Sequence, residues 1–223
     1  IVIPTYRTYE ENSRDPGPID DCVAVVDLVK KMPDVEAQSV VVFGASGGGR
    51  LALELSGLGE RTGLAAVVCG EPATTLFAEM YPVGMKGPNM EVSRTYQKYY
   101  GEKNSTILDR KVKKLSCPIL IVHSDVHQIN TLNNRFLIPK IKAQGKDLKA
   151  VLYPGVRHGF YWGQGRTGIT VEMFEKMAAD MKGYLREHLM PKPVALSLDG
   201  ISSVKQGPDP ARVEAIARML PEF

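Results

Sequence analysis

The sequence predicts an α/β fold, a three-layer α/β/α sandwich around a mostly parallel sheet. Short runs rich in Val, Ile and Leu recur along the 223 residues, bounded by Gly or Pro and without polar alternation. Such runs are typical of parallel strands that are covered on both faces. Amphipathic helical patterns lie between them, and strands that alternate with helices predict a parallel sheet with right-handed crossovers.

The individual elements follow from these two patterns. The expected strands are residues 1–4, 39–44, 64–70, 118–124 and 149–154. The expected helices are residues 20–32, 48–58, 130–145 and 170–189, the third with a kink at Pro139. Residues 71–113 are less regular and form either a short cap-like insertion or a surface excursion with two short helices. The tail, 190–223, carries one amphipathic stretch at 210–220, through which an oligomer could form.

The composition excludes several classes of protein. The net charge of +3 comes from scattered side chains, so we expect no nucleic-acid partner. Three cysteines are too few for a disulfide framework, and four histidines and three cysteines without ligand spacing predict no metal and no organic cofactor. No run reaches the ~18 apolar residues that span a membrane.

A serine lies at the turn between an expected strand and an expected helix. Residues 44–48, GASGG, match the pattern G-x-S-x-G. A nucleophilic serine at so sharp a turn has a strained backbone, so its neighbours Gly44 and Gly48 must be small. The turn would expose the hydroxyl of Ser46, and the N–H of Gly47 would point to where an oxyanion forms. We therefore predict a nucleophile at Ser46 and an oxyanion donor at Gly47.

Two phosphate-binding motifs compete for the same glycines. A P-loop needs Lys and then Ser or Thr after its glycines, whereas Arg50 and Leu51 follow here. A dinucleotide-binding turn needs G-x-G-x-x-G, and Ser46 interrupts that pattern. A purely structural turn is the third interpretation. The position between a strand and a helix favours the nucleophile.

A serine nucleophile needs a general base, and His158 is the best placed histidine. It lies in YPGVRHGF, residues 153–160, after the last expected strand. That position is at the carboxyl edge of the sheet, where Ser46 also lies and where ligands gather in open α/β sheets. His123 ends a buried strand and His188 lies late in a helix, so we expect structural roles for both.

The order of these motifs resembles the α/β-hydrolase superfamily. GASGG, then CPILIVHS at 117–124, then YPGVRHGF and a final helix follow one another as in that superfamily. The YR at residues 6–7 and the PILIVH pattern resemble its prolyl-oligopeptidase-like and dienelactone-hydrolase-like branch. The resemblance covers about residues 1–188. It implies a Ser–acid–His triad in that chain order, with Ser46 and His158 at the matching positions.

The acid of the triad is where the sequence departs from the family. The family usually has an aspartate four residues beyond His123, and that position is His127 here. Asp125 is the carboxylate of this loop and is our first candidate, because the loop can be rebuilt locally. Glu71, directly after the strand 64–70, is the alternative acid, since some members carry their acid there. His127 could instead contact the substrate.

The family also takes a second oxyanion N–H from a loop after a strand further upstream. The chain begins with Ile inside a strand-like run, so we expect it to be an incomplete record of a longer protein. VALSL, at 194–198, is the one spare strand-like run. No signal peptide is visible, and the location stays open between cytoplasm and secretion. Tyr6, after the first strand, could line the substrate pocket or be structural.

Together these residues predict a serine hydrolase that cleaves small-molecule carboxylic esters through an acyl-enzyme. A serine peptidase of the prolyl-oligopeptidase type is one alternative. A non-catalytic small-molecule binding protein on a hydrolase scaffold is another. We expect a catalytic domain over residues 1–189, with 71–113 as a possible cap segment, followed by the tail 190–223.

Overall fold

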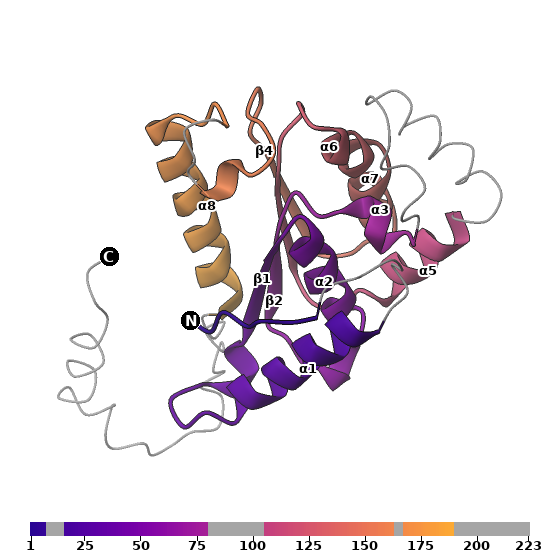
Figure 1. The fold of residues 1–223 in the computed structure, drawn as a ribbon, viewed down its shortest axis with the longest axis vertical. Helices are drawn as coiled ribbons and strands as arrows, with labels where there is room; N and C mark the ends of the chain where they lie inside the picture. The colour runs from indigo at the N-terminus through magenta and orange to yellow at the C-terminus, as the bar shows by residue number, and fades with distance from the viewer. Residues whose placement is uncertain (8–15, 80–104, 163–166, 190–223) are drawn as a thin grey trace, which may run out of the picture. The chain divides into compact units, whose positions relative to one another are not determined.

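The computed structural model describes residues 1–7, 16–79, 105–162 and 167–189, which contain a four-stranded parallel sheet (Figure 1). The strand order is β1-β2-β3-β4, so each strand pairs with the next one along the chain. The strands are β1 (Val41–Ala45), β2 (Ala66–Gly70), β3 (Ile119–His123) and β4 (Leu148–Leu152). The predicted α/β fold class is confirmed.

Helices connect the strands and flank the sheet. The α-helices are α1 (Gly17–Lys30), α2 (Gly47–Ser56), α3 (Thr74–Phe77), α5 (Ser105–Lys114), α6 (Gln128–Leu132), α7 (Ile138–Ala143) and α8 (Val171–Leu189). Short 3-10 turns are η1 (Ala37–Ser39), η2 (Gly59–Arg61) and η5 (Phe160–Trp162), and η4 (Asn133–Leu137) is a π-turn. None of the described helices is both long and apolar enough to cross a membrane.

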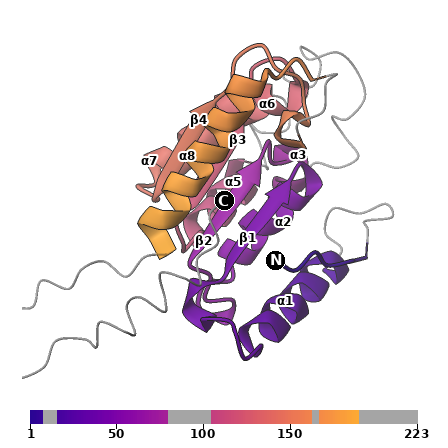
Figure 2. The same cartoon turned by 90° about the vertical axis from the view of Figure 1, so that its left-hand side faces the viewer.

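Alternate strand residues pack into two separate hydrophobic layers. Val67, Cys69 and Ile121 point to one face, where they pack with residues of α1, α2, α5 and α7. Val68 and Leu120 point to the other face and pack with residues of α8. Figure 2 shows α8 along its face of the sheet. Strands buried on both faces are what the unbroken apolar runs predict.

The predicted strand at residues 1–4 is wrong. These residues form no strand, and the side chains of Ile1 and Ile3 are exposed. A strand needs a hydrogen-bonding neighbour as well as β-branched residues, and among the described residues nothing pairs with this segment. An apolar run alone therefore did not predict a strand; in the described part of the chain, β1 and β4 are the outer strands of the sheet.

The predicted kink at Pro139 coincides with an irregular helix. Residues 130–145 form α6, the π-turn η4 and α7, with Pro139 in the first turn of α7. Proline has no N–H and its ring crowds the carbonyl of the preceding turn, so the wider π-turn accommodates it. Residues 80–104 of the cap-like insertion, and the tail with 194–198 and 210–220, lie outside the described residues.

Candidate active site

Ser46 lies between the end of β1 and the start of α2, as the sequence predicts. Its backbone has φ 52° and ψ −114°, a conformation that a residue with a side chain rarely adopts. The N–H of Ser46 donates to the carbonyl of Gly70 at 2.8 Å, and its carbonyl accepts from Ala73 at 2.9 Å. The strained turn is therefore fastened to the carboxyl end of β2.

Two close backbone contacts explain the glycines of this turn. A Cβ on Gly44 would lie 2.1 Å from the carbonyl oxygen of Gly48, so Gly44 must be glycine. A Cβ on Gly48 would meet nothing closer than the Tyr6 hydroxyl at 3.8 Å. The second glycine that the packing requires is Gly49, where a Cβ would lie 2.9 Å from Pro72. A Cβ therefore fits at Gly48, so this position does not require glycine itself.

Gly47 is the first residue of α2. The N–H groups in the first turn of a helix have no carbonyl partner within that helix, and the helix dipole places positive potential there. The N–H of Gly47 follows the nucleophile directly, which is the position expected for an oxyanion donor. Tyr6 is near the same turn, since its hydroxyl faces Gly48.

Glu71 follows β2 directly and has a buried side chain, 0% exposed. Its Oε1 accepts hydrogen bonds from Asn130 Nδ2 at 2.6 Å and from the hydroxyl of Ser124 at 2.9 Å. Its Oε2 accepts from the N–H of Gly159 at 3.0 Å. Burial alone would raise the pKa of Glu71, but the contacts with His158, Asn130 and Gly159 outweigh burial and lower it.

His158 lies against this carboxylate. Its Nδ1 is 2.7 Å from Glu71 Oε2, although the ring N–H is not aligned for a full hydrogen bond. Hydrogen bonds between catalytic groups are often misaligned without substrate and tighten when it binds. The ring of Tyr161 stands edge-on to His158 at 6.1 Å. A buried carboxylate beside a part-exposed imidazole can orient the ring and stabilise its charged form.

The first candidate acid, Asp125, has a different contact. Its Oδ1 accepts from the N–H of Gly155 at 2.8 Å, in an exposed position. This bond joins the loop after β3 to the loop that carries His158. Among the described residues, the ion pair to His158 comes from Glu71 and none comes from Asp125. The geometry therefore favours the alternative acid of the sequence analysis.

His127 and two polar residues complete the surroundings. The ring of His127 stacks on that of His158, with centroids 4.7 Å apart and planes 22° apart. Ser124 and Asn130, which support Glu71, were not anticipated from the sequence. Ser124 directly follows the buried strand β3 at the same sheet edge, and that position was the available signal. Nothing in the local pattern singles out Asn130, because its partner is 59 residues away.

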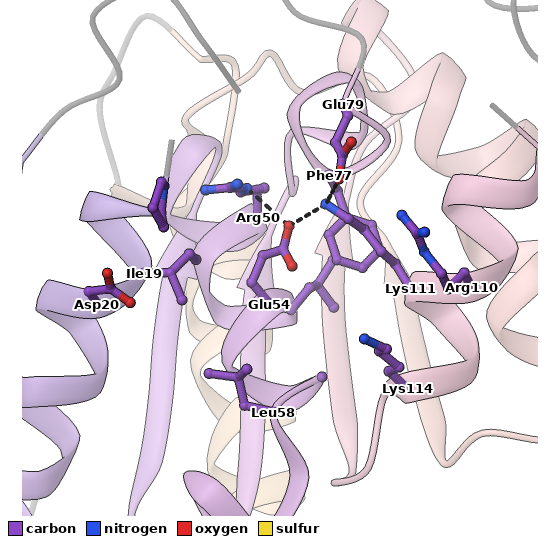
Figure 3. A pocket seen from close by; sticks show the side chains of 13 residues that line it. Ile19, Asp20, Arg50, Glu54, Leu58, Phe77, Glu79, Arg110, Lys111 and Lys114 are labelled. Atoms are coloured by element: carbon purple, nitrogen blue, oxygen red, sulfur yellow. Dashed lines mark hydrogen bonds and ion pairs between the residues drawn. The ribbon is translucent and has the colours of Figure 1, made fainter. Parts of the chain in front are cut away.

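A cavity of about 440 Å³ lies between α1, α2, α3 and α5 (Figure 3). Its wall holds a chain of ion pairs: Glu54 contacts Arg50 at 3.4 Å and Lys111 at 2.6 Å, and Lys111 contacts Glu79 at 3.1 Å. Neither Ser46 nor His158 lines this cavity. The cavity is therefore separate from the residues that are expected to carry the chemistry. Over the described ranges, no group of three or more His, Cys, Asp or Glu is placed to hold a metal.

Comparisons with known proteins agree with this architecture. The model of the prolyl oligopeptidase family matches residues 9–183. No curated protein sequence is significantly similar to the chain. Thermogutta terrifontis esterase 2, phosphonylated by sarin, is a similar solved structure with 17% identity and a TM-score of 0.60, and the match covers 84% of this chain and 73% of that one.

Two further solved structures have a similar fold. Carboxyl esterase 2 from the mycorrhizal fungus Tuber melanosporum has 17% identity and a TM-score of 0.54, with 78% of this chain and 63% of that one covered. A dienelactone hydrolase-like promiscuous phosphotriesterase from metagenomic libraries has 16% identity and a TM-score of 0.53, with 76% and 61% covered. At these identities the likeness shows the fold alone.

The family match and the observed fold agree with each other. The family model spans well over half of the chain, from the residues before α1 into α8. The parallel sheet and its flanking helices are those of an α/β-hydrolase. Together they support the prediction of a serine hydrolase. The chain belongs to the prolyl oligopeptidase family of α/β-hydrolases.

Proposed function

We propose that this protein is a serine hydrolase that cleaves carboxylic esters of small molecules. Ser46 is the nucleophile, His158 the general base and Glu71 the acid of the triad. The observation that supports this best is the Glu71–His158 pair, 2.7 Å apart and attached to the strand end that also holds the Ser46 turn. Gly70 accepts from the Ser46 N–H, and the next residue, Glu71, contacts His158.

The reaction proceeds in two steps. With Nδ1 of His158 facing Glu71, Nε2 is the nitrogen that takes the proton of the Ser46 hydroxyl while its oxygen attacks the ester carbonyl. The N–H of Gly47 stabilises the negative charge on the carbonyl oxygen. The ester C–O bond then breaks, and His158 gives its proton to the departing alcohol. Water attacks the acyl-enzyme by the same route and releases the carboxylic acid.

Glu71 supplies a permanent charge for this cycle. Its lowered pKa keeps the carboxylate ionised near neutral pH, so it can stabilise the imidazolium that forms on His158. The hydrogen bonds from Ser124 and Asn130 hold Oε1, while Oε2 faces the histidine and also accepts from the N–H of Gly159. A carboxylate that is held by several hydrogen-bond donors can orient the imidazole while moving little itself during the reaction.

Two observations bear on the choice of substrate. Similar solved structures named as esterases favour ester cleavage. The name of the family favours the alternative, a serine peptidase of the prolyl-oligopeptidase type. A panel of acetyl to octanoyl p-nitrophenyl esters beside prolyl peptide amides separates the two activities.

The experiment that tests the proposal is labelling with a fluorophosphonate, followed by intact mass and peptide mapping. An esterase of this fold is phosphonylated by sarin, so a phosphonate probe is appropriate. We expect one adduct, on Ser46, in the wild-type protein and in Ser39→Ala, and none in Ser46→Ala. His158→Ala should slow labelling by about 10²–10⁴-fold, the usual contribution of a general base.

A different pattern would contradict the proposal. Folded wild-type protein that acquires no adduct and hydrolyses no ester would support the non-catalytic binding alternative. In that case, binding of a small apolar ester would be unchanged by Ser46→Ala.

A further inference from the structure

We propose that His127 is a positioning residue for His158: its stacked ring fixes the plane of the His158 imidazole. This inference rests on the proposed function of His158. It replaces the expectation that His127 contacts the substrate. Three features of the structure lead to it: the stacking geometry, the anchoring of His127, and its link to Glu71.

The stack joins two loops that are far apart in the sequence. His127 follows β3, and His158 follows β4. Their rings are nearly parallel, with planes 22° apart and centroids 4.7 Å apart. Offset stacking at this distance is favourable for aromatic rings. At one edge of His158, Nδ1 contacts Glu71, and the ring of Tyr161 lies perpendicular to the imidazole with centroids 6.1 Å apart. The stack adds a restraint on one face of the His158 ring.

His127 is itself anchored. It is the residue before α6, and its Nδ1 accepts a hydrogen bond from the N–H of Ile129 at 3.2 Å. The proton of the neutral ring is therefore on Nε2. A ring held at the start of a helix cannot turn freely, so it can serve as a fixed surface for its neighbour.

The same helix start also holds the acid. Asn130 is the third residue of α6, and its N–H donates to the carbonyl of His127 at 2.9 Å. Its side chain donates to Glu71 Oε1 at 2.6 Å and to the Ser124 hydroxyl at 2.8 Å. The first turn of α6 thus carries the stacking partner of His158 and supports its carboxylate partner. The start of this one helix therefore holds the stacking ring and helps to hold the carboxylate that follows β2.

Charge is compatible with this role. Burial lowers the pKa of His127, and a charge on His158 lowers it further, while Glu71 raises it by less. His127 is then neutral when His158 takes the proton from the serine. The imidazolium faces an uncharged ring rather than a second cation.

Two substitutions separate stacking from helix capping. His127→Phe keeps an aromatic ring of similar width and removes the capping nitrogen. His127→Asn keeps a strong N-cap side chain and removes the ring. If stacking matters, Phe retains kcat within about threefold, while Asn and His127→Ala lose about 10–100-fold in kcat with little change in KM, because a misplaced catalytic group costs up to about 10²-fold. Thermal unfolding of each full-length variant checks that the fold is kept.

Other kinetic outcomes would overturn the inference. Equal losses in Phe and Ala with full activity in Asn would leave only a capping role. A higher KM with unchanged kcat in all three variants would restore the substrate contact.

A second measurement does not depend on activity. In the full chain with ¹³C-labelled histidine rings, the Hε1 proton of His158, assigned with His158→Ala, should shift downfield in His127→Asn as the ring current is lost. It should stay near its original position in His127→Phe. Unmoved resonances in His127→Asn would disprove the stack, whether or not the protein is a hydrolase. Fluorophosphonate labelling of the wild-type protein reports separately on the proposed function.

Discussion

Ser46 and Glu71 have a backbone conformation that few residues with side chains adopt. Their φ angles are 52° and 46°, and each directly follows a parallel strand. Such a conformation costs about 1–3 kcal/mol per residue and persists only where surrounding contacts enforce it. Here the enforcing contacts are backbone hydrogen bonds: the N–H of Ser46 donates to the carbonyl of Gly70, and the N–H of Glu71 donates to the carbonyl of Val122. The strain directs both side chains out of the sheet at the same edge.

The two candidate acids can be separated by isosteric amides. We expect Glu71→Gln to lower kcat for an ester by about 10²–10⁴-fold, because the amide cannot stabilise the imidazolium. We expect Asp125→Asn to change kcat by less than about threefold, since the exposed Asp125 accepts from a backbone N–H, which an amide oxygen also does. Steady-state kinetics of both variants measure this. The reverse order of effects would return the acid role to Asp125.

The β1–α2 turn is the element that presents the nucleophile. Its sharpness brings the carbonyl of Gly48 and the backbone of Pro72 against two glycine α-carbons. Glycine at positions 44 and 49 therefore allows these backbone segments to approach one another closely. Since Gly48 has no such neighbour, the three positions 44, 48 and 49 should differ in tolerance.

Alanine substitutions test that difference. Gly44→Ala should lose about 3 kcal/mol or more in the free energy of unfolding, because the new Cβ meets a backbone oxygen. Gly48→Ala should be neutral or gain about 0.5–1 kcal/mol, since alanine favours the helix over glycine. Urea denaturation of each variant gives these values. A loss in Gly48→Ala as large as that in Gly44→Ala would show that the turn is packed differently.

At the scale of the whole molecule, the buried charge of Glu71 joins separate parts of the fold. Its partners come from the loop after β3, from α6 and from the loop after β4. A network of this kind is strong when every member has a partner and costly when one is lost. The site therefore also stabilises the arrangement of the sheet edge.

Stability should consequently depend on pH through Glu71. Its pKa is lowered in the folded protein, so its contribution is fully present above the ordinary value of 4.5 and is lost as the pH falls through the folded value. The melting temperature of the wild-type protein should fall more between about pH 6 and about pH 3 than that of Glu71→Gln. Calorimetry at several pH values measures the difference. Parallel decreases in both proteins would assign the acid sensitivity to other carboxylates.

Much of the fold could be predicted because its information is local. The runs at 64–70 and 118–124 became β2 and β3, since residues buried on both faces are apolar throughout. The run at 1–4 had the same local pattern without a pairing partner in the described structure. Its failure as a strand shows the limit of local reasoning: pairing depends on a neighbour that the run itself does not specify.

By itself, the sequence determined the α/β class, the turn at Ser46 and the loop of His158. Each of these follows from residues adjacent in the chain, whose spacing sets the backbone locally. Only the tertiary structure decided between Glu71 and Asp125 as the partner of His158 and brought His127 onto its face. Glu71 and His158 are 87 positions apart in the sequence and meet because β2, β3 and β4 lie side by side. The sequence places Glu71 and Asp125 near the same edge of the sheet and does not rank them. The distance from the carboxylate to the His158 imidazole distinguishes them.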